Sequence, residues 1–463
     1  MDYTIFESYF AKGVIENMKS IISKTWHLSL IIGLRFLGLF IVMSVLSAYA
    51  KELPGATATL AGLAVGGYAL TQAALQVPFG VMSDKIGRKQ TILVGLLIFA
   101  IGSIMAGMAD NIITLLSGRF LQGAGAIGAV VIAMISDHVK EEERAHAMAV
   151  MGMVIALAFT AAMVIGPILG GAENGVPFLF YLTAGMAILS IVILFTVVPE
   201  PPRITHTFAE DEAKVRHVFK DKDLLRMYIT FLFHSSTMAI AFFLIPLVLK
   251  DKFELPMGDF WRVYLPAVFF GIVAMGPAAV FGEKYNRGKE VFLVSIAFIA
   301  LAFVMMGFAS NLWLFDTGVV FFFIGFNMFE PLLQSFVSKF AKAHQKGAAL
   351  GVANTFAYIG MGIGATLAGK IFELWSAAGI SIFVLVVSVG WGIWIFGMRN
   401  PGLRGTIYLD TKLFDRSKLT ELKTKEGIND IYVNENEGIM VVKYDKELLD
   451  ENDIKKEMLK KHV

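Results

Sequence analysis

Long apolar runs dominate the chain, and short polar segments separate them. A helix needs about 20 predominantly apolar residues to cross the hydrocarbon core of a bilayer, so each run is a candidate membrane span. About twelve such runs occur. The predicted spans are 25–50, 57–80, 90–109, 111–135, 146–170, 176–198, 224–250, 261–282, 290–309, 312–338, 347–371 and 378–398. The pattern predicts an all-α polytopic membrane bundle.

Composition supports a membrane protein and excludes several kinds of chemistry. Of 463 residues, 56% are hydrophobic and 17% are charged, against about 25% charged residues in a soluble domain. The chain has no cysteine, which rules out disulfides, thiol nucleophiles and Cys-ligated metals. The net charge of +2 gives no reason to expect a nucleic acid partner. No nucleotide-binding Gly-rich loop followed by Lys-Ser or Lys-Thr occurs in a polar segment, so ATP is not the expected energy source. No enzyme activity, cofactor or metal site is expected.

The loops differ in their content of basic residues, which predicts the orientation of the chain. Lys and Arg gather in loops after even-numbered spans and are nearly missing from the opposite loops, where only Lys51, Lys250 and Lys252 break the pattern. Because basic loops stay in the cytoplasm, both termini are expected there, in a multi-pass protein of a bacterial inner membrane. Residues 1–24 precede the first span and are expected to form a cytoplasmic amphipathic helix, so that span is not a cleaved signal peptide.

An internal repeat divides the spans into two sets. Residues 79–89 lead into the third run, and residues 281–289, which are similar, lead into the ninth. Two six-helix halves, 25–198 and 224–398, joined by a charged cytoplasmic linker at 199–223, are therefore expected. Many transporters are built from such repeats.

Three motifs resemble those of a known family. The first is Gly80-x-x-x-Asp84-Lys85-x-Gly87-Arg88-Lys89, which is similar at every defining position to the cytoplasmic loop motif of the major facilitator superfamily. The second is Gly166-Pro167-x-x-Gly170-Gly171, which resembles the motif of its proton-coupled antiporters. The third, at 119–126, resembles a motif of the drug:proton antiporter branch with an embedded arginine. The resemblance implies a transporter whose first, fourth, seventh and tenth helices line a central cavity.

Residue chemistry gives the loop motif a physical role. Gly80 and Gly87 permit tight turns and close helix approach, while Asp84 can accept hydrogen bonds from Arg88 or from a helix N-terminus. Asp137, at the end of the fourth run, is placed to join them, as the resemblance also implies. We expect a latch between the halves on the cytoplasmic side. The alternative is a loop that only sets topology, which would explain the basic residues but not the aspartate and glycines.

The segment at 166–171 has two interpretations. Small residues let membrane helices pack closely, and proline is tolerated there as a bend. The segment is expected to be a packing and bending element that restricts leak between the halves. The alternative is close helix packing without any transport role.

Three ionisable residues lie well inside predicted spans: Arg35, Arg119 and Glu330. An embedded charge costs at least ~2.5–3.5 kcal/mol, so each one predicts a function or a partner. Arginine stays protonated, whereas a carboxyl can exchange a proton, which makes Glu330 the candidate proton carrier. The alternative for all three is a structural ion pair within the bundle, for example between Glu330 and Arg35.

Other polar residues in the spans are weaker candidates. His234 can titrate near neutral pH, but its place near the cytoplasmic end of its span also suits an interfacial histidine. Gln122 and Asn327 can bind substrate or form hydrogen bonds between helices.

The polar tail at 404–463 is expected to form a separate cytoplasmic domain. Its predicted elements, in the order βαββα, are strands at 407–409, 428–433 and 439–442, helices at 416–423 and 451–461, and a hairpin turn at 434–438. This small α+β domain resembles a ferredoxin-like fold, some members of which carry metals. Without cysteine the metal-carrier loop is missing, which favours a domain that self-associates or binds a regulator.

Together these features predict secondary active transport by alternating access. The predicted activity is proton-coupled efflux of small amphipathic organic compounds by a monomer, with the substrate, protons and the lipid bilayer as its partners. Two alternatives remain at this point: proton-coupled uptake of a metabolite, and a membrane-embedded sensor that signals through its tail.

Overall fold

The computed structural model describes residues 3–139, 143–200, 221–341, 346–400, 404–410, 425–434, 438–446 and 448–458. These residues fall into two compact units. Unit 1 contains residues 1–207, 239–265 and 362–373, and unit 2 contains residues 208–238, 266–361 and 374–463. Most of the predicted linker at 199–223 lies outside the described residues.

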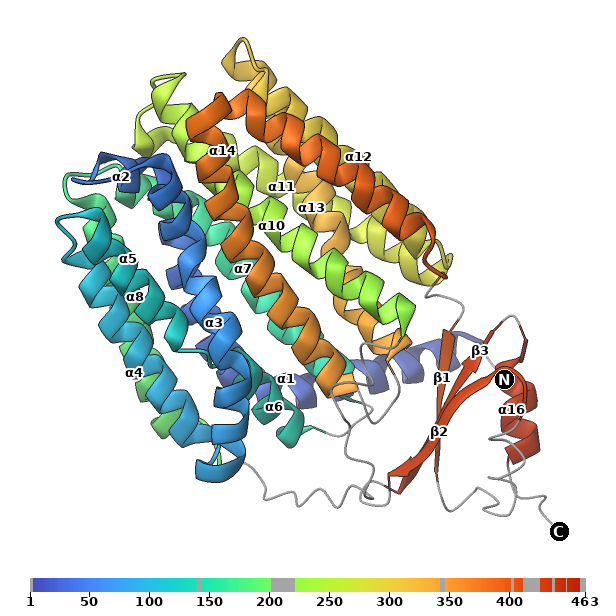
Figure 1. Ribbon diagram of the computed structural model, residues 1–463. Helices are drawn as coiled ribbons and strands as arrows, with labels where there is room; N and C mark the ends of the chain where they lie inside the picture. Colours follow the sequence, from blue (N-terminus) through green and yellow to red (C-terminus); the bar gives the residue numbers. More distant parts are fainter. Residues whose placement is uncertain are drawn as a thin grey trace. The chain divides into compact units, whose positions relative to one another are not determined.

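The helices of the first six predicted spans form a bundle within unit 1. These helices are α1 (Tyr3–Met43), α2 (Leu46–Glu52), α3 (Ala58–Ile86), α4 (Arg88–Gly107), α5 (Ile112–Ala124), α6 (Gly128–His138), α7 (Arg144–Gly170) and α8 (Gly175–Thr196). α4 lies beside α5 and α8, as Figure 1 shows. Two predicted spans are interrupted: α1 ends at a turn before α2, and Gly125 to Ile127 separate α5 from α6. α1 runs through the predicted boundary at residue 24 without a break.

The helices of the remaining predicted spans begin with α10. They are α10 (Lys222–Asp251), η2 (Met257–Asp259), α11 (Trp261–Ala279), the π-helical turn η3 (Val280–Lys284), α12 (Gly288–Gly307), α13 (Leu312–Phe340) and α14 (Lys346–Phe396). Ser376, with φ 56° and ψ −161°, interrupts α14 between the two spans predicted there. Among the described residues, 11 helical stretches are long and apolar enough to cross a membrane, the last being Gly347–Phe396, which contains Ser376. The predicted membrane bundle is confirmed.

Matching turns support the internal repeat. The Asn111 side chain accepts a hydrogen bond from Thr114 N at 2.9 Å at the start of α5, and Asn311 accepts one from Leu314 N at 2.9 Å at the start of α13. These N-caps satisfy backbone donors that a helix start leaves free. Each half therefore begins this helix with the same local chemistry.

The tail forms a small α+β domain within unit 2. β1 (Arg404–Asp410), β2 (Ile428–Asn434) and β3 (Ile439–Asp445) make an antiparallel sheet in the order β1-β3-β2, and α16 (Glu451–Met458) follows. Alternate strand residues form a core with α16: Ile407, Leu409, Ile431, Met440, Val442, Tyr444 and Ile454. The three predicted strands are present. The helix predicted at 416–423 and the turn residues 435–437 lie outside the described residues, so the ferredoxin-like assignment stays a prediction.

Candidate functional site

The predicted loop motif joins α3 to α4 through Gly87. Gly87 has φ 99° and ψ 155°, a conformation that residues with a Cβ rarely adopt. A Cβ at Gly80 would meet nothing within 4 Å. The structure therefore supports the turn role of Gly87 but does not place Gly80 at a close helix contact.

Arg88 gathers two carboxylates from two other helices. Its Nη1 donates to Asp84 Oδ1 on α3 at 2.6 Å, and its Nε donates to Asp137 Oδ2 on α6 at 3.1 Å. The planar guanidinium suits such a bridge, because its donors point in fixed directions. The Asp84 side chain remains 67% exposed, whereas that of Asp137 is 15% exposed. Asp84 thus keeps acceptor capacity for a further donor.

The two lysines of the motif lie in different surroundings. Lys85 is exposed. Lys89 is buried, donates to Val198 O at 2.7 Å and forms an ion pair with Glu200 at 3.0 Å. Lys89 therefore fixes the chain just after α8 and is not part of the Asp84–Arg88–Asp137 cluster.

Arg119, on α5, is fully buried within unit 1. Its Nε donates to Ala64 O at 2.9 Å, and its Nη1 donates to Gln122 Oε1 at 2.7 Å. The guanidinium lies 4.6 Å from the centre of the Tyr68 ring. Among the described residues no carboxylate lies within ion-pair distance of Arg119. Gln122 in turn donates to Ser103 Oγ at 2.8 Å, so its amide is engaged on both sides.

Arg35, on α1, is also buried. Its Nη2 donates to Gln72 Oε1 and to Gly125 O, both at 3.1 Å, and the guanidinium lies 5.3 Å from the centre of the Phe99 ring. Gly125 follows α5, where the helix is interrupted. The interruption thus supplies a carbonyl that points at an embedded cation.

Glu330 differs from both arginines. It lies on α13 and is exposed, although ten residues, or ~15 Å, separate it from the end of the helix at Phe340. Among the described residues Glu330 has no hydrogen-bond or ion-pair partner. The next residue, Pro331, lies inside the helix and cannot donate to the carbonyl of Asn327, which weakens the backbone ladder at this point. Glu330 is therefore an exposed carboxylate well inside its span.

His234 and Asn327 are held close to the same stretch of α13. His234, on α10, is buried, its Nε2 lies 3.1 Å from Phe326 O, and its ring stacks on Phe326 with centres 4.1 Å apart. Asn327 Nδ2 donates to Phe323 O on its own helix at 2.8 Å. Each side chain therefore has a backbone partner in the structure.

The segment at 166–171 packs the end of α7 against the end of α1, the turn that follows α1, and η2. A Cβ at Gly166 would clash with Ile41 O and Ser44 Oγ, and one at Gly171 would clash with Gly258 N. Gly170 makes a looser contact, with Val45 3.1 Å from an added Cβ. Pro167 lies inside α7. The glycines thus permit close approach, as expected from their size.

Sequence reasoning missed the contacts of two charged clusters. One joins Lys51 and Glu52 at the end of α2 to Lys250 and Asp251 at the end of α10. The other pairs Glu283 of η3 with Lys339 of α13. The first had a sequence signal, since Lys51 and Lys250 are exceptions in otherwise weakly basic loops.

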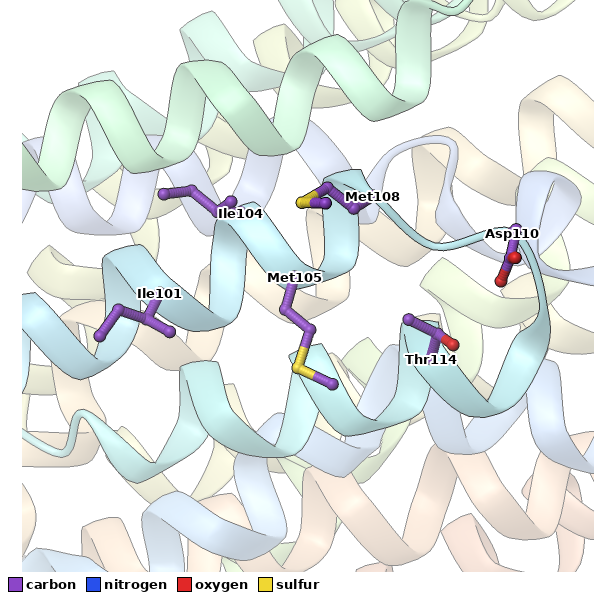
Figure 2. A pocket seen from close by; sticks show the side chains of 6 residues that line it. All are labelled: Ile101, Ile104, Met105, Met108, Asp110 and Thr114. Carbon is purple, nitrogen blue, oxygen red and sulfur yellow. The ribbon is translucent and has the colours of Figure 1, made fainter.

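A shallow depression of about 460 Å³ lies along α4 and the start of α5. Figure 2 shows its lining side chains, Ile101, Ile104, Met105, Met108, Asp110 and Thr114. Ile101, Ile104 and Met108 are exposed apolar residues, as expected of a surface in contact with lipid. The depression brings together none of the predicted site residues. Among the described residues no group of three or more His, Asp or Glu side chains could hold a metal ion.

Comparisons with known proteins agree with the motifs. The family profile described as "Major Facilitator Superfamily" matches residues 28–277 and 261–426. The chain is 34% identical to "Inner membrane transport protein YajR" of Escherichia coli (strain K12) over 430 residues, 91% of this chain and 94% of that protein. It is 26% identical to "Quinolone resistance protein NorA" of Staphylococcus aureus (strain COL), over 77% of this chain and 93% of NorA.

Solved structures share the fold. A bacterial homolog of the human lysosomal transporter Spinster, in an inward-facing and unoccupied conformation, matches with a TM-score of 0.66 and 15% identity, over 82% of this chain and 96% of that one. Similarity at this level shows the fold alone. The family profile and the identity to YajR go further: the chain belongs to the major facilitator superfamily, whose members are not enzymes but multi-pass membrane transporters of small molecules.

Proposed function

We propose that the protein exports small amphipathic organic compounds in exchange for protons, by alternating access across a bacterial inner membrane. In this proposal both termini are cytoplasmic, and the loop containing Asp84 and Arg88 faces the cytoplasm. The protein needs no cofactor, because the proton gradient supplies the energy.

The observation that carries the proposal is the exposed carboxylate of Glu330 in the middle of α13. An acid at this depth is costly unless it serves a function or has a partner, and among the described residues it has no partner. Neutralisation by a proton removes most of the cost of enclosing it in a dry cavity. Proton binding at Glu330 can therefore change the relative free energies of the two cavity states.

In this proposal the embedded Arg119 and Glu330 have different roles, one electrostatic and one in proton transfer. Arg119 is held by two helix carbonyls and by Gln122, and it stays charged at any physiological pH. It can bias the electrostatic potential of the cavity but cannot carry the transported proton. Glu330 can do so, since a carboxyl both binds and releases a proton.

The direction of transport is proposed from the relatives. NorA is described as a quinolone resistance protein, a description that suits export. YajR is described as an inner membrane transport protein, which supports the proposed location. The same fold also occurs in a D-xylose-proton symporter, at 14% identity and a TM-score of 0.64, and the test below distinguishes export from uptake.

The test uses proteoliposomes with an imposed proton gradient and a panel of amphipathic organic dyes. Glu330→Gln keeps the size and hydrogen bonding of the side chain while fixing it in a neutral form. We expect this variant to insert and to exchange dye passively, but to lose proton-driven accumulation and the pH dependence of transport. Dye accumulation by this variant should fall at least tenfold, which corresponds to a loss of about 1.4 kcal/mol of the free energy that drives accumulation.

Glu290→Gln is the matched control, because Glu290 is an exposed carboxylate in the first turn of α12. It should transport at the wild-type rate. If Glu330→Gln still drives uphill transport with unchanged pH dependence, Glu330 is not the carrier, and His234 is the next residue to test. Accumulation in the opposite direction would indicate uptake instead of export.

A further inference from the structure

Four charged residues form two crossed ion pairs between α2 and α10. Lys51 Nζ lies 2.5 Å from Asp251 Oδ2, and Lys250 forms an ion pair with Glu52. Each helix thus ends with a lysine followed by an acid, and the two dipeptides pair reciprocally. The residues are 200 and 198 positions apart in sequence, so no local turn brings them together.

A second contact lies beside these pairs, between α3 and α14. Glu373 accepts a hydrogen bond from Thr59 N at 2.9 Å, and Lys51 lies 5.7 Å from the centre of the Phe372 ring. A Cβ at Gly62 would clash with Ala365 O, and one at Gly369 would clash with Ala58 O. The backbones of α3 and α14 therefore meet without side chains between them.

Further contacts extend the same closed region. Tyr264 Oη donates to Ser44 O at 3.2 Å, and Ser47 Oγ lies 3.4 Å from Phe242 O. Ser47 is fully buried. All of these groups belong to unit 1, which joins residues 239–265 and 362–373 to the first six spans.

This region lies at the opposite end of α3 from the loop motif. Thr59 is in the first turn of α3 and Gly87 follows its last residue, which at ~1.5 Å per residue places them about 40 Å apart. A transporter that works by alternating access must close and reopen this end in every cycle. Exposed ion pairs suit that task, because each one stabilises a contact only weakly: the side chains of Lys51 and Asp251 are 39% and 40% exposed.

We propose that Lys51, Glu52, Lys250 and Asp251 form a latch that holds this end closed and opens in each transport cycle. The proposal rests on the alternating-access cycle proposed above. The glycine contacts of α3 and α14 give the closed end its shape, and the crossed pairs set how readily it opens. Because each lysine is adjacent to an acid of its own helix, reversal of one charge places three like charges together and repels the helices.

The absence of native cysteine allows a direct test. Ser47→Cys introduces a single thiol at a fully buried position beneath the latch. The purified full-length protein in lipid nanodiscs is treated with a polar maleimide, and the rate of labelling is measured without substrate or a proton gradient. Lys51→Glu in this background is expected to increase the rate at least fivefold, and Lys51→Glu with Asp251→Lys to bring it back towards the starting value.

Lys252→Glu is the matched control, since it makes the same charge change two residues from Lys250 and its aromatic contact is with neighbouring Phe253. It should leave labelling within twofold of the parent. Raised salt should accelerate labelling of the parent but not of Lys51→Glu, because exposed pairs are screened. Equal labelling of parent, Lys51→Glu and Lys250→Glu, with all three folded by melting temperature, would overturn the latch. A failure of proton-coupled export would leave these rates unchanged, so the two proposals are tested separately.

Discussion

The loops that lead into α4 and into α12 start from similar sequence but pair their charges in opposite senses. In the first, a base of the loop, Arg88, binds an acid at the end of α6, Asp137. In the second, an acid of the loop, Glu283, binds a base at the end of α13, Lys339, and also accepts a hydrogen bond from Ser335 Oγ at 2.5 Å. Both bridges reach the end of the fourth or tenth predicted span, but their polarity is reversed and they start from different places: Arg88 begins α4, whereas Glu283 lies in η3, before the turn that leads into α12.

The reversal has an energetic consequence at the helix ends. The C-terminal end of a helix carries a partial negative charge, which favours a nearby base and disfavours an acid. Lys339 is therefore favourably placed at the end of α13, whereas Asp137 at the end of α6 depends on Arg88. The first loop also keeps an exposed acid, Asp84, while Glu283 already has two donors. The first loop is thus the one suited to make and break a further contact.

The largest difference between the loops is expected on removal of the base. Arg88→Ala leaves Asp137, 15% exposed, beside a helix C-terminus without the arginine that pairs with it. We expect a loss of roughly 2 kcal/mol of stability, between the values for exposed and buried pairs, and little remaining transport. Lys339→Ala should cost less than about 1 kcal/mol. Thermal unfolding in detergent measures the stability of each variant, and a dye assay measures its transport. Equal losses in Arg88→Ala and Lys339→Ala would contradict the difference expected between the two loops.

A smaller effect is expected from removing the exposed acid. Asp84→Asn retains the side-chain shape but loses the charge that attracts Arg88 and a further donor. We expect transport to fall about tenfold, equivalent to ~1.4 kcal/mol in the slowest step, with normal insertion. Glu283→Gln is the control in the other half and should retain at least half of the transport rate. Wild-type transport by Asp84→Asn at normal abundance would mean that the loop only sets topology.

Hydropathy predicted the spans because a bilayer demands about 20 apolar residues in each crossing. It did not locate the interruption between α5 and α6, where the run stays apolar while Gly125 leaves the helix. The clustering of Asp84, Arg88 and Asp137 followed from the motif, and the bond between Arg119 and Gln122 follows from their i, i+3 spacing on one helix face. The exposure of Glu330 could not be predicted, since hydropathy indicates depth in the membrane but not the direction of a side chain.

The pairing of Lys51 with Asp251 could not be predicted from the sequence for a different reason. It joins chain segments that are 200 residues apart, and a single sequence has no signal for such a contact. The sequence did mark Lys51 and Lys250 as exceptions to the distribution of basic residues.

The tail domain places a second base, Lys443, at the C-terminal end of α13, in addition to Lys339. The end of α13 thus has two bases, whereas the end of α6 has the acid Asp137. Side chains alternate along β3, so Val441 and Lys443 lie on the face opposite the core residues Met440, Val442 and Tyr444. Both Val441 and Lys443 are buried, and Lys443 Nζ donates to Ser338 O at 2.9 Å and to Ala341 O. The lysine thus binds carbonyls at the negative end of α13, where α6 has an acid.

Reversing this charge should have the smallest effect on transport and a local effect on the tail. Lys443→Glu places a carboxylate against helix carbonyls, which disfavours the contact between β3 and α13. We expect hydrogen exchange in β3 to become about tenfold faster, equivalent to ~1.4 kcal/mol of lost protection, while transport changes less than about twofold. Lys446→Glu, at an exposed position after β3, makes the same charge change and should leave exchange unaltered. If the two variants exchange alike, Lys443 does not hold the tail to α13, and Lys339 is the base that stabilises the negative end of that helix.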